Sequence, residues 1–146
     1  MFGKSVFAMT ALAATVACAH PNYQEEVAPL NDHKPASTCA LSYANGLCVD
    51  ITWEVQPTED AAGSFLLKFY SANTPEVAMD PQSKVSVVLW MPAMGHGSSP
   101  VTVTQVSQGV YRATNVFFVM PGAWEIRIKL KNDKNETTEV VQAINI

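Results

Sequence analysis

The sequence has no basic patch, no recognisable catalytic signature and almost no helical periodicity. Nine of its 146 residues are Lys or Arg, against 13 Asp or Glu, which gives a formal net charge of −4. An acidic chain without clustered basic residues argues against nucleic acid as a partner. Phosphate loops, dinucleotide fingerprints, His-Glu-x-x-His and Gly-x-Ser-x-Gly are all missing, so we do not expect an enzyme.

Long apolar runs are missing too, apart from one near the N-terminus. Lys4 is followed by an apolar run from Val6 to Ala17 that ends in small residues, the pattern of a secretory signal peptide. A transmembrane helix needs about 20 apolar residues, so this run is too short to span a membrane. Residues 1–18 are therefore predicted to be a signal peptide, and the protein is predicted to be exported.

Cysteine is scarce, with residues only at positions 18, 39 and 48. Cys39 and Cys48 flank a segment that contains an Asn-Gly turn signal at 45–46, and a hairpin there would bring the two thiols together. Their spacing does not match the Cys-x-x-Cys redox motif, and two thiols alone do not complete a zinc site. We predict a structural disulfide between Cys39 and Cys48.

The third cysteine, Cys18, requires its own explanation, because an odd thiol is unusual in an exported protein. If 15–18 is a lipobox, Cys18 becomes the lipidated first residue, although Thr15 stands where Leu is common. If Ala17-Cys18-Ala19 is instead an A-x-A cleavage site, the mature chain starts at His20. We expect lipidation, with the polar, aperiodic residues 19–37 as a flexible tether.

Two-residue alternation of apolar and polar side chains is widespread after the tether. It is clearest at 124–131, where Trp, Ile, Ile and Leu alternate with Glu, Arg, Lys and Lys. About seven such runs occur, separated by turns rich in Pro, Gly, Asn and Asp. They include 49–55, 65–69, 85–91, 101–103, 116–120, 124–131 and 136–146. We therefore predict that residues 38–146 form an all-β domain, an immunoglobulin-like antiparallel β-sandwich.

Two similar corners carry the residues best suited to chemistry. The first reads Trp90-Met91-Pro-Ala-Met94-Gly-His96-Gly, and the second reads Met120-Pro-Gly-Ala-Trp124. Thioether and imidazole groups on short turns favour a soft or borderline metal ion, copper and above all Cu(I). Thioethers also suit an exported protein, in which thiols tend to oxidise. Met91, Met94, His96 and Met120 are therefore candidate copper ligands, provided that both corners lie at one end of the sandwich.

Each candidate also has a plainer interpretation. Met91 continues the apolar phase of 85–89, and Met120 continues that of 116–118, so either residue would serve equally well in the core. His96 would be an ordinary solvated loop residue. Trp90 and Trp124 are expected to be packing residues, although an indole over a cuprous ion is an alternative.

With the Gly-x-Tyr at 109–111 between them, the two Met-Pro corners resemble the YtkA-like family over about residues 48–146. Its members are exported β-sandwich domains related to FixH, which is associated with assembly of copper-dependent oxidases. The resemblance maps Met94, His96 and Met120 onto the family's Met/His-rich corner. The Cys39/Cys48 pair and the lipid anchor are not part of that pattern.

Our leading hypothesis is a periplasm-facing lipoprotein, anchored in the outer membrane by lipid alone, that buffers copper or passes it to a partner. A copper-handling or oxidase-assembly protein of the envelope is the expected partner. Without lipidation the protein would be soluble in the periplasm. The alternative is a metal-free interaction module, in which the Met and Trp corners form an adaptable apolar surface for a partner protein.

Overall fold

The computed structural model describes residues 39–58 and 60–146. Within these ranges the secondary structure is entirely β, as the alternation predicted, and no helix in them is long and apolar enough to cross a membrane. The predicted signal peptide, the predicted lipidation site Cys18 and the predicted tether all lie outside the described residues. The strands are β1 (Leu47–Val55), β2 (Gly63–Ser71), β3 (Thr74–Ala78), β4 (Lys84–Met91), β5 (His96–Gly97), β6 (Thr102–Ser107), β7 (Val110–Val116), β8 (Ala123–Lys131) and β9 (Thr137–Asn145).

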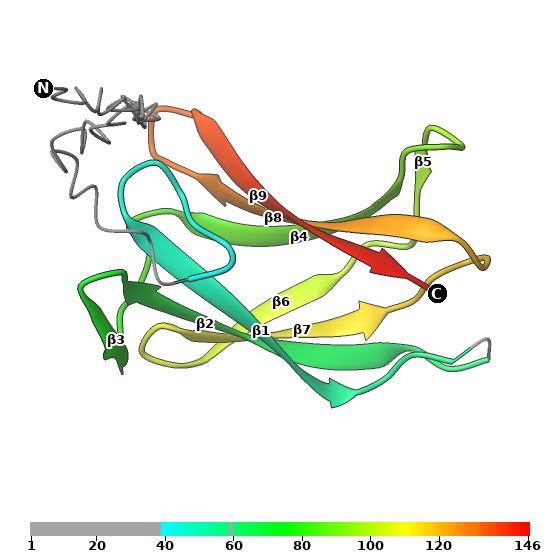
Figure 1. The fold of residues 1–146 in the computed structure, drawn as a ribbon, viewed down its shortest axis with the longest axis horizontal. Helices are drawn as coiled ribbons and strands as arrows, with labels where there is room; N and C mark the ends of the chain where they lie inside the picture. The colour runs from blue at the N-terminus through cyan, green and yellow to red at the C-terminus, as the bar shows by residue number, and fades with distance from the viewer. Residues whose placement is uncertain (1–38, 59) are drawn as a thin grey trace, which may run out of the picture. The chain divides into compact units, whose positions relative to one another are not determined.

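The strands form two antiparallel sheets that lie in two layers (Figure 1). One sheet has the order β1-β2-β7-β6, with β3 beside the end of β2, and the other has the order β5-β4-β8-β9. The predicted β-sandwich is therefore confirmed. Three strands lie outside the predicted runs, namely β3, β5 and all of β7 except Val116, and the first two are short: β3 contains Pro75 and is largely exposed, and β5 is two residues long. Neither is long enough or alternating enough to be recognised in the sequence.

The core lies between the sheets and is built from the predicted alternating residues. Phe65, Leu67 and Phe69 of β2 are fully buried, and they pack in one cluster with Trp124, Ile126, Ile128 and Leu130 of β8. Burying each such side chain contributes about 1.5–3 kcal/mol. Polar residues between them, such as Lys68 and Arg127, face outward. The two-residue period thus determines which face of each strand meets the other sheet.

The Cys39–Cys48 disulfide is present, with Cα atoms 5.8 Å apart. The predicted turn brings the cysteines together: Gly46 has a φ of +80°, and the Leu47 N–H donates to the Asn45 side chain at 3.1 Å. The Tyr43 hydroxyl then donates to the Ile128 carbonyl of the opposite sheet at 3.1 Å. Burial raises the pKa of Tyr43 above its ordinary value. The hairpin is therefore linked to both layers of the sandwich.

The predicted strand at 116–120 is wrong, because β7 ends at Val116. Asn115 adopts a φ of +60°, a conformation that interrupts a regular strand. Its side-chain amide donates to the Pro100 carbonyl at 2.9 Å, and the Ser98 hydroxyl donates to the Phe117 carbonyl. Residues 117–122 consequently form a turn, and Phe118 is buried without belonging to a strand.

Candidate functional site

The first corner is a tight turn at the end of β4. Met91 is only 5% exposed and packs in the core, as its strand phase predicted. Its carbonyl accepts hydrogen bonds from the N–H groups of Met94 at 3.2 Å and Gly95 at 3.0 Å, and Gly95 has a φ of +65°. The turn therefore places Met94 at its tip, where 59% of the residue is exposed.

His96 follows this turn and lies opposite Met91 in the β4–β5 ladder. We expected the whole of 92–97 to be irregular, but His96 and Gly97 form the short strand β5. The His96 Nδ1 is 3.1 Å from the Gly97 carbonyl oxygen. Because a carbonyl can only accept, a hydrogen bond between these atoms places a proton on Nδ1, and in that tautomer Nε2 carries the lone pair that could bind a metal ion.

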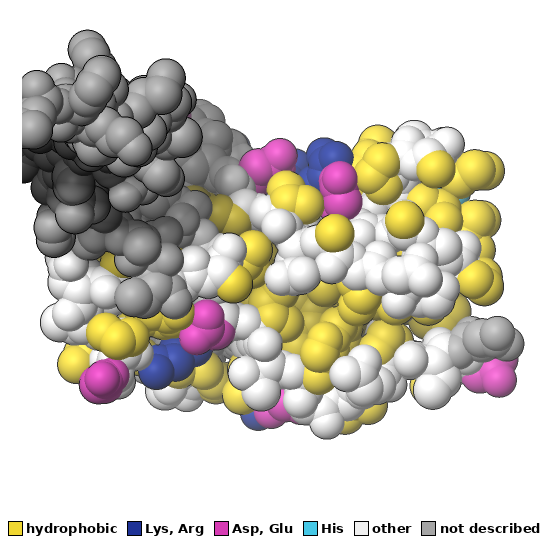
Figure 2. Space-filling model, viewed as in Figure 1, with side chains coloured by type: hydrophobic (Ala, Val, Ile, Leu, Met, Phe, Trp, Pro, Cys, Tyr) yellow, Lys and Arg dark blue, Asp and Glu magenta, His cyan; other side chains and the backbone are white. Residues whose placement is uncertain are grey.

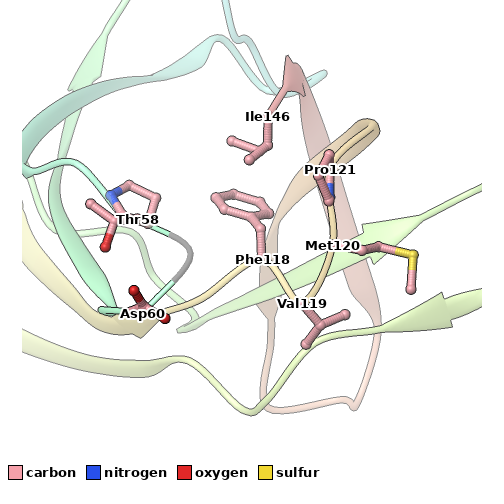
Figure 3. Close-up of a pocket in the computed structure, with 8 residues that line it drawn as sticks. Thr58, Asp60, Phe118, Val119, Met120, Pro121 and Ile146 are labelled. Carbon is pink, nitrogen blue, oxygen red and sulfur yellow. The ribbon is translucent and has the colours of Figure 1, made fainter.

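The second corner is the 117–122 turn, and Met120 lies on its surface. Met120 is 37% exposed, so the interpretation of Met120 as a core residue is wrong. The reason is the end of β7 at Val116, after which the chain no longer follows a strand period. Figure 3 shows the Met120 side chain directed away from Phe118 and Ile146. Its thioether is thus presented at the surface.

The two corners meet around Trp124, the second residue of β8. Its indole Nε1–H donates to the Met120 carbonyl at 3.0 Å, and its ring packs against the His96 ring with centroids 6.0 Å apart. Gly122 lies against Met91, since a Cβ built on Gly122 would be 2.7 Å from the Met91 Cε. The structure therefore brings the Met91/His96 pair and the Met120 turn together. Met94 lies at the tip of the turn that joins Met91 to His96. We refer to Met91, Met94, His96 and Met120 as the Met/His corner.

A cavity of about 640 Å³ lies beside this corner (Figure 3). Buried Phe118 lines it together with the exposed side chains of Val119, Met120 and Ile146. The loop after β1 completes the wall with Pro57, Thr58 and Asp60. Sequence reasoning missed this cavity, because the 57–60 loop is about 60 residues away from the 117–122 turn and carries no motif of its own.

The donor set of the corner is soft. Within the described ranges, no three His, Cys, Asp or Glu side chains gather in a way that could hold a metal ion. The described cysteines are joined in the disulfide. The groups available at the corner are therefore thioethers and one imidazole, a set that fits Cu(I) and does not fit magnesium, calcium or a Cys/His zinc site.

Trp124 serves in core packing, as expected, whereas Trp90 is part of neither core cluster. Trp124 is 1% exposed and lies in the core cluster. Trp90 is on the opposite face of β4, where the Arg127 guanidinium lies 5.3 Å from its ring centroid. Arg127 is in turn paired with Glu125 at 2.6 Å. The exposed face of Trp90 is thus already occupied by a cation of the protein itself.

Comparison with known proteins connects this domain with a family. The family model described as YtkA-like matches residues 44–129, a range that begins in the disulfide hairpin, ends within β8 and includes both Met-Pro corners. A search of curated proteins gave no significant match. Since the matched range covers more than half of the chain, this protein belongs to the YtkA-like family.

Proposed function

We propose that this protein binds copper at the Met/His corner in the cell envelope, and that it buffers the ion or transfers it to a partner protein. The observation that carries the proposal is the meeting of the two Met-Pro corners around Trp124. Met91 and Met120 are about 30 residues apart in the sequence, and the pairing of Trp90 with Glu125 in the β4–β8 ladder places the end of β4 beside the turn that precedes β8.

The chemistry of the individual groups supports this function. The hydrogen bond from the His96 Nδ1–H to the Gly97 carbonyl orients the ring in the way that is common for metal-binding histidines. Thioethers from Met94 and Met120 would favour Cu(I) over Cu(II). Met91 lies opposite His96 in the β4–β5 ladder and is buried in the core, so it would contribute its sulfur only if the end of β4 moves.

Exposure of the corner supports transfer rather than permanent storage. Met94 and Met120 are on the surface, and Figure 2 shows hydrophobic side chains gathered at the end of the molecule that carries β5. Ligands on an exposed turn can be exchanged one at a time with those of a docked partner. A copper-handling or oxidase-assembly protein of the envelope is the partner that we propose.

Export and lipid anchoring belong to the same proposal. A Cys39–Cys48 disulfide suits an oxidising compartment such as the periplasm. It also leaves Cys18 as the single remaining thiol, as lipidation requires. Fatty-acid labelling of the exported protein tests the anchor, because a water-soluble product that begins at His20 would exclude it.

A metal-free interaction module is the second candidate, and a specific observation favours it. Exposed Val119, Met120 and Ile146 surround the 640 Å³ cavity. Exposed apolar groups around a hollow are typical of surfaces that bind another protein. Under this alternative, the methionines provide flexible packing instead of sulfur donors.

A copper titration of the mature protein distinguishes the two candidates. Cu(I) would be added without oxygen in the presence of a chromogenic chelator, and Cu(II) would be added in a parallel series. We expect one equivalent of Cu(I) to bind and to change the Trp fluorescence, because Trp124 contacts His96. The matched control is a Met94→Leu, His96→Phe, Met120→Leu variant, which keeps the apolar volume but removes the donors. Equal behaviour of the two proteins would favour the interaction module.

A further inference from the structure

The Trp124 side chain contacts both halves of the Met/His corner. Its indole Nε1–H donates to the Met120 carbonyl at 3.0 Å. Its ring meets the His96 ring at an interplanar angle of 71° and the Phe118 ring at 68°, in edge-to-face arrangements. At 1% exposure, Trp124 is held by the core, so its own position does not depend on the turns that it contacts.

The Met120 turn needs such an anchor, because it lies outside the strand ladders. Gly122 is fixed by two reciprocal hydrogen bonds with Ile146, each 3.0 Å long. These bonds hold the C-terminal end of the turn. The indole hydrogen bond holds the Met120 carbonyl, two residues earlier. Trp124 therefore restrains the backbone from which the Met120 side chain leaves.

His96 is held in a similar way. Its backbone pairs with Met91 in a ladder only two residues long, which restrains the chain less than a full strand would. The Trp124 ring and the Gly97 carbonyl both contact the His96 ring. Together these contacts restrict both the backbone and the ring of His96.

We propose that Trp124 is a positioning residue of the Met/His corner, which holds the Met120 turn through its indole N–H and the His96 ring through an edge-to-face ring contact. This inference rests on the proposed copper-binding function. Partners that orient metal ligands typically change metal affinity by about 10–100-fold when they are replaced. Trp124 would act in this way without being a ligand.

Trp124→Phe is the first test, because it retains an aromatic ring but removes the N–H donor. We expect the affinity for Cu(I), measured by chelator competition, to fall about tenfold. We also expect Met120→Leu to lower the affinity in the wild type but to add little in the Trp124→Phe background. A purely structural role of Trp124 would instead make the two losses additive. Trp53→Phe is the matched control, since Trp53 packs against Phe65 in the other sheet, and we expect it to bind Cu(I) as the wild type does.

A second measurement does not require metal. Methyl-¹³C methionine NMR of the metal-free protein should show a shifted Met120 methyl signal in Trp124→Phe, whereas Met94 at the tip should be unchanged. If Trp124→Phe does not fold, 3-(1-naphthyl)alanine at position 124 keeps a two-ring side chain without the N–H donor and should give the same results.

The outcomes separate the two proposals. If the wild type binds copper and the position-124 variants bind it equally well, or their losses are additive with Met120→Leu, the positioning role is wrong and the copper function stands. If the wild type binds no copper, the proposed function fails. The metal-free NMR then decides on Trp124 alone, and an unchanged Met120 signal would overturn its positioning role.

Discussion

The two ends of the sandwich differ in how their turns are held and in what those turns expose. At the disulfide end, which comprises the 39–48 hairpin and the turn at Gly109, the backbone is held by a covalent bond, by Tyr43 and by Asp80, which accepts from the Gly109 N–H and the Gln105 side chain. At the Met/His end, the turns expose large apolar side chains, among them Met94 and Met120. Under the proposed function, stability and copper binding would be located at separate ends, so that exposed donors would not weaken the fold.

The largest effect on stability should come from the disulfide. Replacing both Cys39 and Cys48 by Ser should lower the free energy of unfolding by about 2.5–3 kcal/mol, because the unfolded chain regains the entropy of a ten-residue loop. Urea unfolding of the oxidised wild type, the reduced wild type and the double variant measures this loss. If the two ends are independent, Cu(I) affinity stays unchanged. A large loss of Cu(I) affinity in the folded double variant would contradict the separation of the ends.

Two glycines provide a matched comparison between the ends. Gly109 and Gly95 have nearly the same φ, +66° and +65°. A Cβ on Gly109 would lie 2.4 Å from the Met79 backbone nitrogen, whereas a Cβ on Gly95 would meet nothing within 4 Å. Gly95→Ala should therefore cost only the left-handed backbone strain, about 1–2 kcal/mol. Gly109→Ala should cost at least about 1 kcal/mol more, because backbone must also move. Thermal and urea unfolding would measure both, and equal losses would show that the disulfide end is not the more tightly packed one.

Tyr43 should contribute less. Tyr43→Phe removes the hydrogen bond to the Ile128 carbonyl and should lower the free energy of unfolding by about 1 kcal/mol at neutral pH. Burial raises the pKa of Tyr43 in the folded state. The folded protein therefore disfavours the phenolate, and this part of the stability is present below pH 10 and is lost as the pH rises further.

Urea unfolding of both proteins between pH 7 and pH 11 would measure this dependence. The wild type should lose stability above pH 10 more steeply than Tyr43→Phe. Parallel pH profiles would show that the Tyr43 phenol is not responsible.

The sequence predicted the two ends unequally well. Alternation and cysteine number were enough for the sandwich and the Cys39–Cys48 bond, because both depend on local patterns with a fixed period or a short loop. At the other end, the apolar alternation correctly predicted that Met91 is buried, but its extension to Met120 failed, because Met120 is exposed. β7 ends just after Asn115, which has a positive φ and whose side chain donates a hydrogen bond to the Pro100 carbonyl. That hydrogen bond is a tertiary contact, which the local pattern does not reveal. The cavity beside Phe118 and the link through Trp124 could not be foreseen either, since they join segments that are distant in the sequence.

The smallest effect on stability, with the largest effect on binding, is expected at the Met/His corner itself. Met94→Leu and His96→Ala change exposed or half-buried side chains and should alter the free energy of unfolding by no more than about 0.5 kcal/mol. His96→Ala should weaken the binding of Cu(II) more than that of Cu(I), because imidazole is the harder donor. Met94→Leu should weaken the binding of Cu(I) more than that of Cu(II). Chelator competition for each oxidation state measures these changes, with Met79→Leu, which alters an exposed methionine of the disulfide end, as the control. Met79→Leu should change neither affinity. If Met79→Leu weakened Cu(I) binding as much as Met94→Leu does, copper would be binding to exposed methionines in general. The contrast between the two ends would then have no functional meaning.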